Sequence, residues 1–493
     1  MLFNSVEFLV FLPIAFAIYW LMKDRLKLQN AFVVVASYFF YGWWDWRFLI
    51  LIAFTSACSY ASGLLIEKVR NNVNLNVNVD KELNIDKDKA ANRKARRITA
   101  ANIVINLLIL GVFKYYNFFV ESFVTIFPAL NADRLLLNVI LPVGISFYTF
   151  QALSYSIDVY RHKLEPTHDI VAFFAFVSFF PQLVAGPIER ATNLLPQFGQ
   201  KRSFDYATAV DGCRQMLWGF FKKMVVADRC AVFVDTVWND YASQSGSTLI
   251  MAAICFTFQI YGDFSGYSDI AIGTAKLFGI KLKRNFNVPY FSRDIAEFWR
   301  RWHISLTTWF RDYLYIPLGG SRVSKAKIVR NTFIIFLVSG LWHGANWTFV
   351  AWGTYHAILF LPLILLGKNR RHTDTVAEGR LLPSFREFLQ MLLTFALAVF
   401  GWIIFRAENI NQALDYISLI FQHSLFSVPQ IPGLTLLFTL AMLVTEWLTR
   451  TKEHGFAIEG LKQRWMRWII YYVLTFCIIF YSHQSETFIY FQF

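Results

Sequence analysis

The stretch from Asn331 to Ala357, NTFIIFLVSGLWHGANWTFVAWGTYHA, decides how the rest of this chain is interpreted. It places His343 between two apolar runs, Phe333–Leu341 and Trp347–Trp352. An ionisable side chain at such a depth is expected to face a protein interior or a water-filled cavity. His343 is therefore a candidate functional residue, and the alternative is a core histidine or a helix–helix hydrogen bond.

Composition extends this interpretation from one stretch to the whole chain. Of its 493 residues 56% are hydrophobic and only 16% are charged. Apolar segments of about 20 residues, the length that crosses a bilayer core, recur along nearly the whole sequence. The sequence predicts an all-α, polytopic membrane protein with a single domain over residues 1–493. We expect ten to twelve spans together with re-entrant or broken helices.

The distribution of basic residues predicts the orientation in the membrane. The polar segment Glu67–Arg97 is short of aromatic residues, so we expect a mobile loop there. Its Lys and Arg residues, with those of residues 23–27, place both segments in the cytoplasm by the positive-inside rule. The N-terminus, which lacks a basic leader region, is then a retained first span that begins outside the cytoplasm. The net charge of +14 is assigned to loops and anionic headgroups, with no nucleic acid.

Several segments combine apolar and helix-breaking or charged residues. Pro142 and Gly144 interrupt one predicted span, and such breaks occur at membrane depth only inside protein or along a cavity. VAGPIER, at residues 184–190, gives a second break. Lys222 and Lys223 suggest an interfacial or re-entrant helix. Asp263 and Asp269 are costly in an apolar segment, so they are expected to pair or to face the interior.

A second histidine, His303, lies in WRRWH within the segment Phe298–Leu318. Four charged residues interrupt this segment, which is therefore not a simple span. At helical spacing Trp299, Trp302, Leu306 and Trp309 form a stripe beside His303, and interfacial anchoring is the favoured interpretation of these aromatics.

A dense basic band precedes His303. It consists of Lys281, Lys283, Arg284, Arg293, Arg300 and Arg301. The band could hold the phosphates of a nucleotide-like donor at the mouth of a cavity. A cytoplasmic loop attracted to anionic lipid explains the charge equally well, so both interpretations stay open.

Histidine is the side chain that exchanges protons near neutral pH. In a water-poor cavity His343 could deprotonate a hydroxyl, whose oxygen then attacks an activated acyl carbon. Trp342 and Asn346 are candidate donors to the oxyanion, and Asn346 shares a face with His343 if the helix persists. Metal-site spacing such as HExxH, the GxSxG elbow and phosphate loops are absent from the sequence, so no metal ligand is assigned.

Long motifs identify a family resemblance. WRRWHISLTTWFRDYLYIPLGG and LVSGLWHGANWTFVAWGTYHA resemble the membrane-bound O-acyltransferase (MBOAT) family. PVGISFYTFQALSYSIDVYR, FFPQLVAGPIER, YGDFSGYSDIAIG and the closing FIYFQF are similar to its bacterial branch of alginate and peptidoglycan O-acetylation and teichoic acid D-alanyl transfer. The resemblance covers nearly the whole chain except Glu67–Arg97.

The resemblance implies helices around a central funnel or tunnel, with His343 as the catalytic histidine and His303 as a second required one. It implies acetyl-coenzyme A as a cytoplasmic co-substrate near the basic band, with no permanently bound cofactor. The acetyl group would pass through the bacterial inner membrane to an extracytoplasmic SGNH-like acetyltransferase and then to a polysaccharide. These substrate expectations are analogies at the level of family.

Two alternatives remain open. D-alanyl transfer from a phosphopantetheine carrier protein to teichoic acid would require a docking surface for that carrier. A transporter or channel would explain broken helices and the intramembrane Asp263, Asp269 and His343, but such proteins typically contain paired repeats, and the sequence contains no internal symmetry.

Overall fold

The computed structural model describes residues 1–74, 81–127, 135–138, 140–430 and 432–482, and every regular element within these ranges is helical. The chain forms two compact units. The first comprises Met1–Tyr206 and Ala275–Leu282, and the second comprises Ala207–Thr274 and Lys283–Phe493. The closing FIYFQF motif lies outside the described residues. The single domain over 1–493 stays a prediction.

Helix length and composition confirm the multi-pass membrane protein. Five helices in the described ranges are long and apolar enough to cross a membrane: Phe48–Asn72, Asp88–Ile126, Gly246–Leu277, Trp347–Leu365 and Phe385–Arg406. Val6–Leu21 and Gly433–Leu448 are shorter apolar helices. Helix breaks divide other segments that belong to the ten to twelve spans predicted from the sequence.

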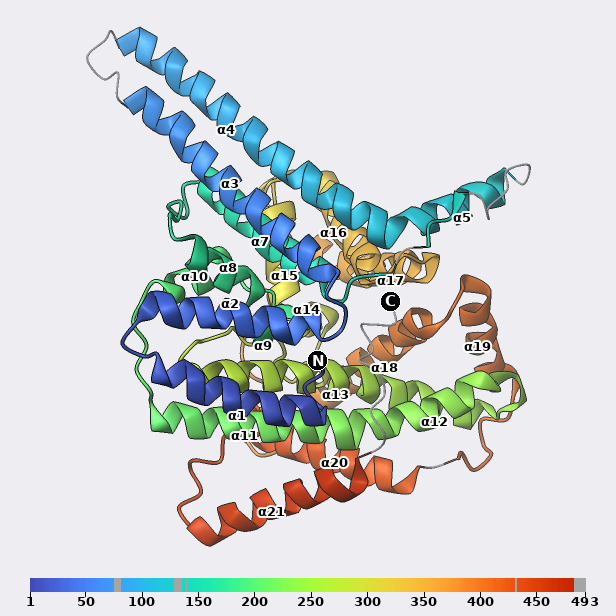
Figure 1. The fold of residues 1–493 in the computed structure, drawn as a ribbon. Coiled ribbons are helices and arrows are strands. Elements are labelled where there is room, and N and C mark those ends of the chain that lie inside the picture. Colours follow the sequence, from blue (N-terminus) through green and yellow to red (C-terminus); the bar gives the residue numbers. More distant parts are fainter. Residues whose placement is uncertain (75–80, 128–134, 139, 431, 483–493) are drawn as a thin grey trace. The chain divides into compact units, whose positions relative to one another are not determined.

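The first unit is a set of packed helices. They are α1 (Val6–Leu21), α2 (Leu26–Gly42), α3 (Phe48–Asn74), α4 (Lys81–Leu110), η1 (Gly111–Tyr115), α5 (Tyr116–Ile126), α7 (Ile145–Tyr160), α8 (Ile170–Ser178), α9 (Phe180–Leu183) and α10 (Ala191–Phe198). α3 and α4 lie side by side as a long hairpin (Figure 1).

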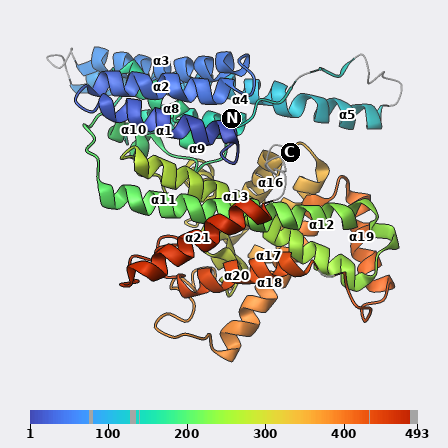
Figure 2. The ribbon, with the colours of Figure 1, turned by 60° about the horizontal axis from the view of Figure 1, so that its bottom comes forward.

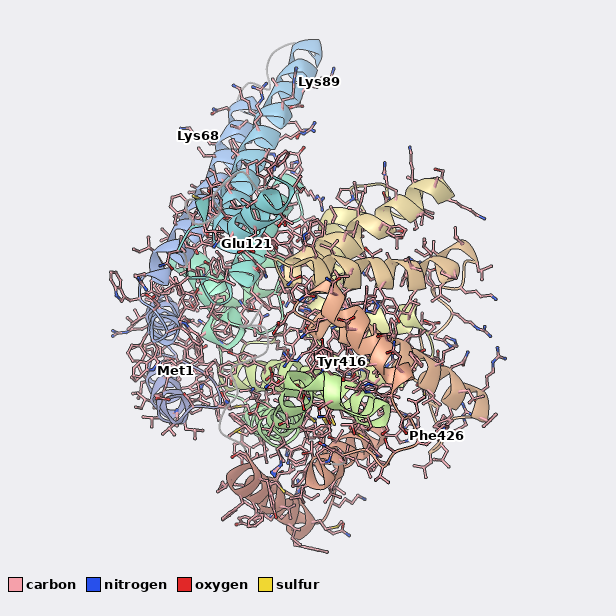
Figure 3. All side chains as sticks on the ribbon, turned by 90° about the vertical axis from the view of Figure 1, so that its right-hand side faces the viewer. Met1, Lys68, Lys89, Glu121, Tyr416 and Phe426 are labelled. Atoms are coloured by element: carbon pink, nitrogen blue, oxygen red, sulfur yellow. The ribbon has the colours of Figure 1, made fainter. Side chains whose placement is uncertain are left out.

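This hairpin corrects the expectation of a loop at Glu67–Arg97. Apart from residues 75–80, which lie outside the description, the segment belongs to α3 and α4. Ala91, Ala95 and Thr99 recur every four residues and are buried, so they form a narrow face on α4. Their small side chains allow a close helix pair, while Lys68 and Lys89 lie on the outer surface (Figure 3). A polar composition here reflects a solvated helix face.

The break predicted at Pro142 and Gly144 is confirmed at the start of α7. Gly144 has a φ of 73°, in the left-handed region that favours glycine, and it directly precedes Ile145. A Cβ atom there would lie 2.8 Å from the carbonyl oxygen of Leu183. The position therefore requires glycine for conformation and for space.

The second unit contains both histidines of interest. Its elements are α11 (Tyr206–Phe220), η2 (Phe221–Ala227), α12 (Asp228–Asn239), η3 (Tyr241–Ser243), α13 (Gly246–Leu277, whose last turn belongs to the first unit), η4 (Pro289–Phe291), α14 (Ile295–Arg301), α15 (Ile304–Phe310), η5 (Arg311–Tyr315), α16 (Lys325–His343), α17 (Trp347–Leu365), α18 (Phe385–Arg406), α19 (Ile410–Gln422), α20 (Gly433–Leu448) and α21 (Arg464–Tyr481). α20 and α21 pack against η2, and Figure 2 shows them along the green helices that flank it.

η2 is a π-helical turn that carries two buried lysines. Lys223 Nζ lies 2.7 Å from both Asp228 Oδ1 and Asp263 Oδ1, and Lys222 Nζ lies 2.7 Å from Asp269 Oδ2. The pairing predicted for the two intramembrane aspartates is confirmed. Each lysine is only 3% exposed, so both side chains face the protein interior. The interfacial or re-entrant location of the helix stays a prediction.

The segment around WRRWH is broken, as expected for a stretch that is not a simple span. α14 ends at Arg301 and α15 begins at Ile304, and His303 between them has a φ of 43°. Interfacial anchoring is wrong for the tryptophans: Trp299, Trp302 and Trp309 are all buried. They pack inside the second unit instead of marking a surface.

Candidate functional site

Two close glycine contacts fix α16 against α17 and thereby place His343. A Cβ atom at Gly340 would lie 2.2 Å from the carbonyl oxygen of Phe349, and one at Gly353 would lie 2.3 Å from that of Phe336. Only glycine permits this approach of the two backbones. His343 is the last residue of α16, so the tight pair holds its ring at the end of a rigid helix.

His343 is surrounded by aromatic rings. Its ring centroid lies 5.0 Å from Trp342, 5.2 Å from Trp352 and 5.5 Å from Phe405, all in edge-to-face geometry. The side chain is 4% exposed. Rings on several sides restrict its rotation and exclude most water.

His303 approaches the same place from the break between α14 and α15. Its ring lies 6.3 Å from that of His343 and 5.6 Å from Trp342, centroid to centroid. Phe264 of α13 contacts it edge-on at 4.7 Å, and Phe286 stacks on it at 6.3 Å. The two histidines that the sequence separates by forty residues therefore face one site.

Both histidines line one cavity of about 210 Å³. Its walls are mainly apolar and aromatic, and it lies between α15–η5 and the α16/α17 pair. The other lining residues are Trp299, Leu306, Thr307, Phe310, Arg311, Tyr315, Thr332, Ile335, Phe336, Ser339, Phe360, Ile364 and Asn369. The exposed Arg311 and the half-buried Asn369 mark its open end, and the histidines lie at its buried end. A long, mostly apolar group that carries a reactive carbonyl fits such a cavity.

The basic band occupies several different environments. Arg293 pairs with Glu297 at 3.0 Å and with Asp374 Oδ1 at 3.0 Å, and Arg301 also pairs with Glu297. The hydrogen bond from Arg293 lowers the pKa of the Asp374 carboxyl. These two arginines lie outside the cavity lining and bind the segment around Asp374 to α14.

Arg300 contributes to the same attachment. Its guanidinium donates hydrogen bonds to the carbonyl oxygens of Asn369, at 2.6 Å, and His372, at 2.5 Å. Since Asn369 lines the open end of the cavity, Arg300 shapes the opening through the backbone. Arg284 donates to the carbonyl oxygens of Phe286 and Lys452.

The remaining two members of the band are exposed. Lys281 belongs to the first unit, and Lys283 begins the returning segment of the second. Donor binding by the six-residue band stays a prediction.

The two candidate oxyanion donors differ in position. Trp342 touches both histidine rings. Asn346 does not share a helical face with His343, because α16 ends at His343 and Asn346 caps α17. Its Oδ1 accepts a hydrogen bond from the Thr348 amide at 3.0 Å, and its Nδ2 donates to the Glu408 carbonyl at 2.7 Å. The geometry gives Asn346 a role as a helix cap.

Sequence reasoning missed some residues of this site. Ser339 and Thr307 add hydroxyls to the cavity wall, and their spacing of four residues from His343 and His303 could have identified them. His356, buried in α17, contacts Trp352 at 4.9 Å and Trp299 at 4.9 Å without lining the cavity. Arg311, one of the four charged residues that interrupt Phe298–Leu318, also lines the cavity.

Comparison with known proteins agrees with this geometry. Residues 145–405 match the model of the membrane-bound O-acyltransferase family, MBOAT. A probable alginate O-acetylase of Pseudomonas aeruginosa is 40% identical over 84% of this chain and 73% of its own length. A peptidoglycan O-acetyltransferase of Helicobacter pylori is 34% identical over 84% of this chain and 78% of its own. A teichoic acid D-alanyltransferase of Bacillus subtilis is 28% identical over 55% of this chain and 70% of its own. The chain belongs to the membrane-bound O-acyltransferase family, and it is an O-acyltransferase.

Proposed function

We propose that this protein takes an acetyl group from acetyl-coenzyme A at the cytoplasmic face and passes it across the membrane for O-acetylation of a cell-envelope or extracellular polysaccharide. The cavity that joins His303 and His343 carries the proposal, because it combines a path for an acyl donor with proton-exchanging groups. The O-acetylating relatives are more similar, over more of the chain, than the D-alanyl-transferring one. The acetyl group is therefore the favoured cargo.

In the proposed reaction His343 acts as general base. Its neutral imidazole takes the proton of the acceptor hydroxyl while the hydroxyl oxygen bonds to the thioester carbon. The carbon–sulfur bond of the tetrahedral intermediate then breaks, and the departing thiolate recovers the proton from the imidazolium. The reaction is balanced and needs no additional reactant. Trp342 is the candidate indole N–H donor to the oxyanion, and His303 orients or polarises the carbonyl from the opposite side.

The donor is proposed to enter at the open end of the cavity. Apolar walls suit the pantetheine arm, while phosphates require cations at the mouth. Arg311 lines this end, and Arg370 lies close enough to Tyr315, another lining residue, to act on it electrostatically. Of the predicted basic band, Arg300 would shape the opening and Arg293 and Arg301 would anchor it. Lys281, Lys283 and Arg284, the other members of the predicted band, are proposed only as positive charge that attracts the phosphates of the donor.

The placement of the protein follows from the same proposal. The N-terminus is proposed to lie outside the cytoplasm of a bacterial inner membrane, since the basic residues of 23–27 and 67–97 favour the cytoplasmic side. The acceptor is the polysaccharide itself or a hydroxyl of an extracytoplasmic SGNH-like acetyltransferase that delivers the group to the polymer.

Acyl transfer by purified protein in nanodiscs with radiolabelled acetyl-coenzyme A tests the proposal. Wild type should release or transfer label, and His343→Ala should lose the activity. His356→Ala is the matched control, because it removes an equally buried histidine that does not line the cavity. Full activity of His343→Ala would exclude it as the base. Turnover with a D-alanyl carrier protein but not with acetyl-coenzyme A would show that the carrier protein is the donor and would overturn the acetyl proposal.

A further inference from the structure

The backbone at His303 is held in an unusual conformation. Its φ and ψ are 43° and 54°, in the left-handed region that few non-glycine residues adopt. Val288, with a φ of 40° and ψ of 59°, is the second such residue nearby, and a β-branched residue before a proline is an outlier there. Strained backbone of this kind persists only where the surrounding structure imposes it, and it is frequent at functional sites.

The segment Asn285–Asn287 holds His303 in this left-handed conformation. The Asn287 amide donates to the Arg301 carbonyl at 2.9 Å, and the Ile304 amide donates to the Asn285 carbonyl at 2.8 Å. These two backbone hydrogen bonds lie on either side of His303. They fix the chain just before and just after the left-handed residue.

The Asn285 side chain adds a third attachment. Its Oδ1 accepts from the Ser305 hydroxyl at 2.8 Å and the Ser305 amide at 3.3 Å, while its Nδ2 donates to Ser268 Oγ of α13 at 3.2 Å. Asn285 is fully buried. A single amide therefore ties the start of α15 to a long apolar helix.

The same segment also orients the imidazole. Phe286, the next residue, stacks on the His303 ring at an interplanar angle of 16°, and Phe264 contacts it edge-on. Asn285 itself lines a different, polar cavity together with Lys222 and Asp269. Asn285 thus acts on the backbone around His303 from outside the cavity in which the acyl donor would lie.

We propose that Asn285 is a positioning residue, which holds His303 in its left-handed conformation and so aims the imidazole at the acyl-transfer cavity. The catalytic consequence of this inference rests on the proposed function. The claim that Asn285 fixes the backbone of His303 does not. A displacement of about 1 Å in a catalytic group can lower a rate about a hundredfold. Removal of the Asn285 side-chain amide should therefore lower the rate of acyl transfer without changing the contacts to the donor.

The geometric part is tested by thermal unfolding of four variants that all lack the histidine: His303→Ala and His303→Gly, each with Asn285 or with Asn285→Ala. With Asn285 present, glycine should raise Tm relative to alanine, because it relieves the left-handed strain. Asn285→Ala removes the side-chain attachment and keeps the two backbone hydrogen bonds, so the advantage of glycine should become smaller. An equal advantage in both backgrounds, or none in either, would overturn the proposal whether or not the protein transfers acetyl.

The catalytic part is tested by kinetics. Asn285→Ala should lower kcat about 10- to 100-fold with little change in donor KM, and should cause no further loss in a His303→Ala background. Asn331→Ala is the control, since it removes another fully buried asparagine, one that donates to the Leu318 carbonyl. Wild-type kcat in Asn285→Ala, or a loss that adds to that of His303→Ala, would reject the positioning role. Inactive wild type would count against the proposed function and leave the Tm result to decide the inference.

Discussion

Two sets of buried ionisable side chains lie in the second unit, and they differ in their surroundings. Lys222 and Lys223 contact three carboxylates within 2.7 Å, so their charges are largely cancelled. His303 and His343 instead contact aromatic rings and line a cavity. An ionisable residue in an apolar segment is thus a sign of cost alone. Lys222 and Asp269 line only a small polar cavity within their ion-pair cluster, whereas the larger, mainly apolar cavity beside the histidines indicates function.

The largest expected effect separates the two sets by stability. Lys223→Met leaves Asp228 and Asp263 without their shared cation, so we expect a loss of about 3–5 kcal/mol. His343→Ala should cost about 1 kcal/mol, since it enlarges an existing cavity and leaves no charge behind. Thermal unfolding in detergent measures both changes.

A triple variant provides the control for this comparison. Adding Asp228→Asn and Asp263→Asn to Lys223→Met removes the stranded charges, and most of the Tm should return. A low Tm in the triple variant would show that the lysine stabilises by packing instead of by charge.

The next effect concerns the helix pair that positions His343. Gly353→Val places atoms where the Phe336 carbonyl already lies, so we expect a loss of about 1–3 kcal/mol together with a lower kcat. Gly433→Ala, at a glycine with open space around it, should change neither Tm nor kcat. Unaltered kcat in a folded Gly353→Val protein would mean that His343 tolerates movement of its helix.

A smaller effect is expected at the cavity opening. Arg300→Gln removes the hydrogen bonds to the Asn369 and His372 carbonyls, so stability should fall by about 1 kcal/mol. Donor KM should rise severalfold with kcat nearly constant, because the opening loosens while the histidines stay in place. The exposed Arg322→Gln is the control. A fall in kcat alone would place Arg300 in the chemistry instead.

The smallest effect is expected at Asp374, whose side chain is 57% exposed. Because Arg293 lowers its pKa in the folded protein, the ion pair stabilises fully above the unfolded value near 3.8 and is lost as pH falls through the lower folded value. Asp374→Asn should cost about 0.5 kcal/mol at pH 7. The Tm difference from wild type should shrink as the pH falls below about 3.8, and a constant difference from pH 7 to pH 3 would contradict the assignment.

Local signals in the sequence predicted part of this structure. The apolar runs beside His343, the break at Gly144 and the cost of Asp263 and Asp269 each follow from neighbouring residues. The end of α16 could also have been predicted, since Gly344 stops a helix and Asn346 caps the next one. The interpretation of Asn346 as an oxyanion donor assumed that one helix continued through it.

Other features depend on partners far away in the sequence. Arg293 finds Asp374 eighty-one residues later, and no spacing rule connects them. Trp299 and Trp302 carry the composition of an interfacial belt, and only the packing around them shows that they are buried. In contrast, the signal for helix α4 is local, although its polar composition favours a loop: Ala91, Ala95 and Thr99 repeat every four residues within a polar stretch.

The π-helical turn η2 has a consequence for how this chain tolerates insertions and deletions. A wide turn holds a residue more than an α-helical turn, and one residue corresponds to about 100° of rotation. The face that α12 presents, with Cys230, Val234 and Val237 buried, therefore depends on that extra residue. Deleting a single amino acid from Phe221–Ala227 would rotate the whole of α12 out of phase with its neighbours, although every remaining residue would still favour a helix.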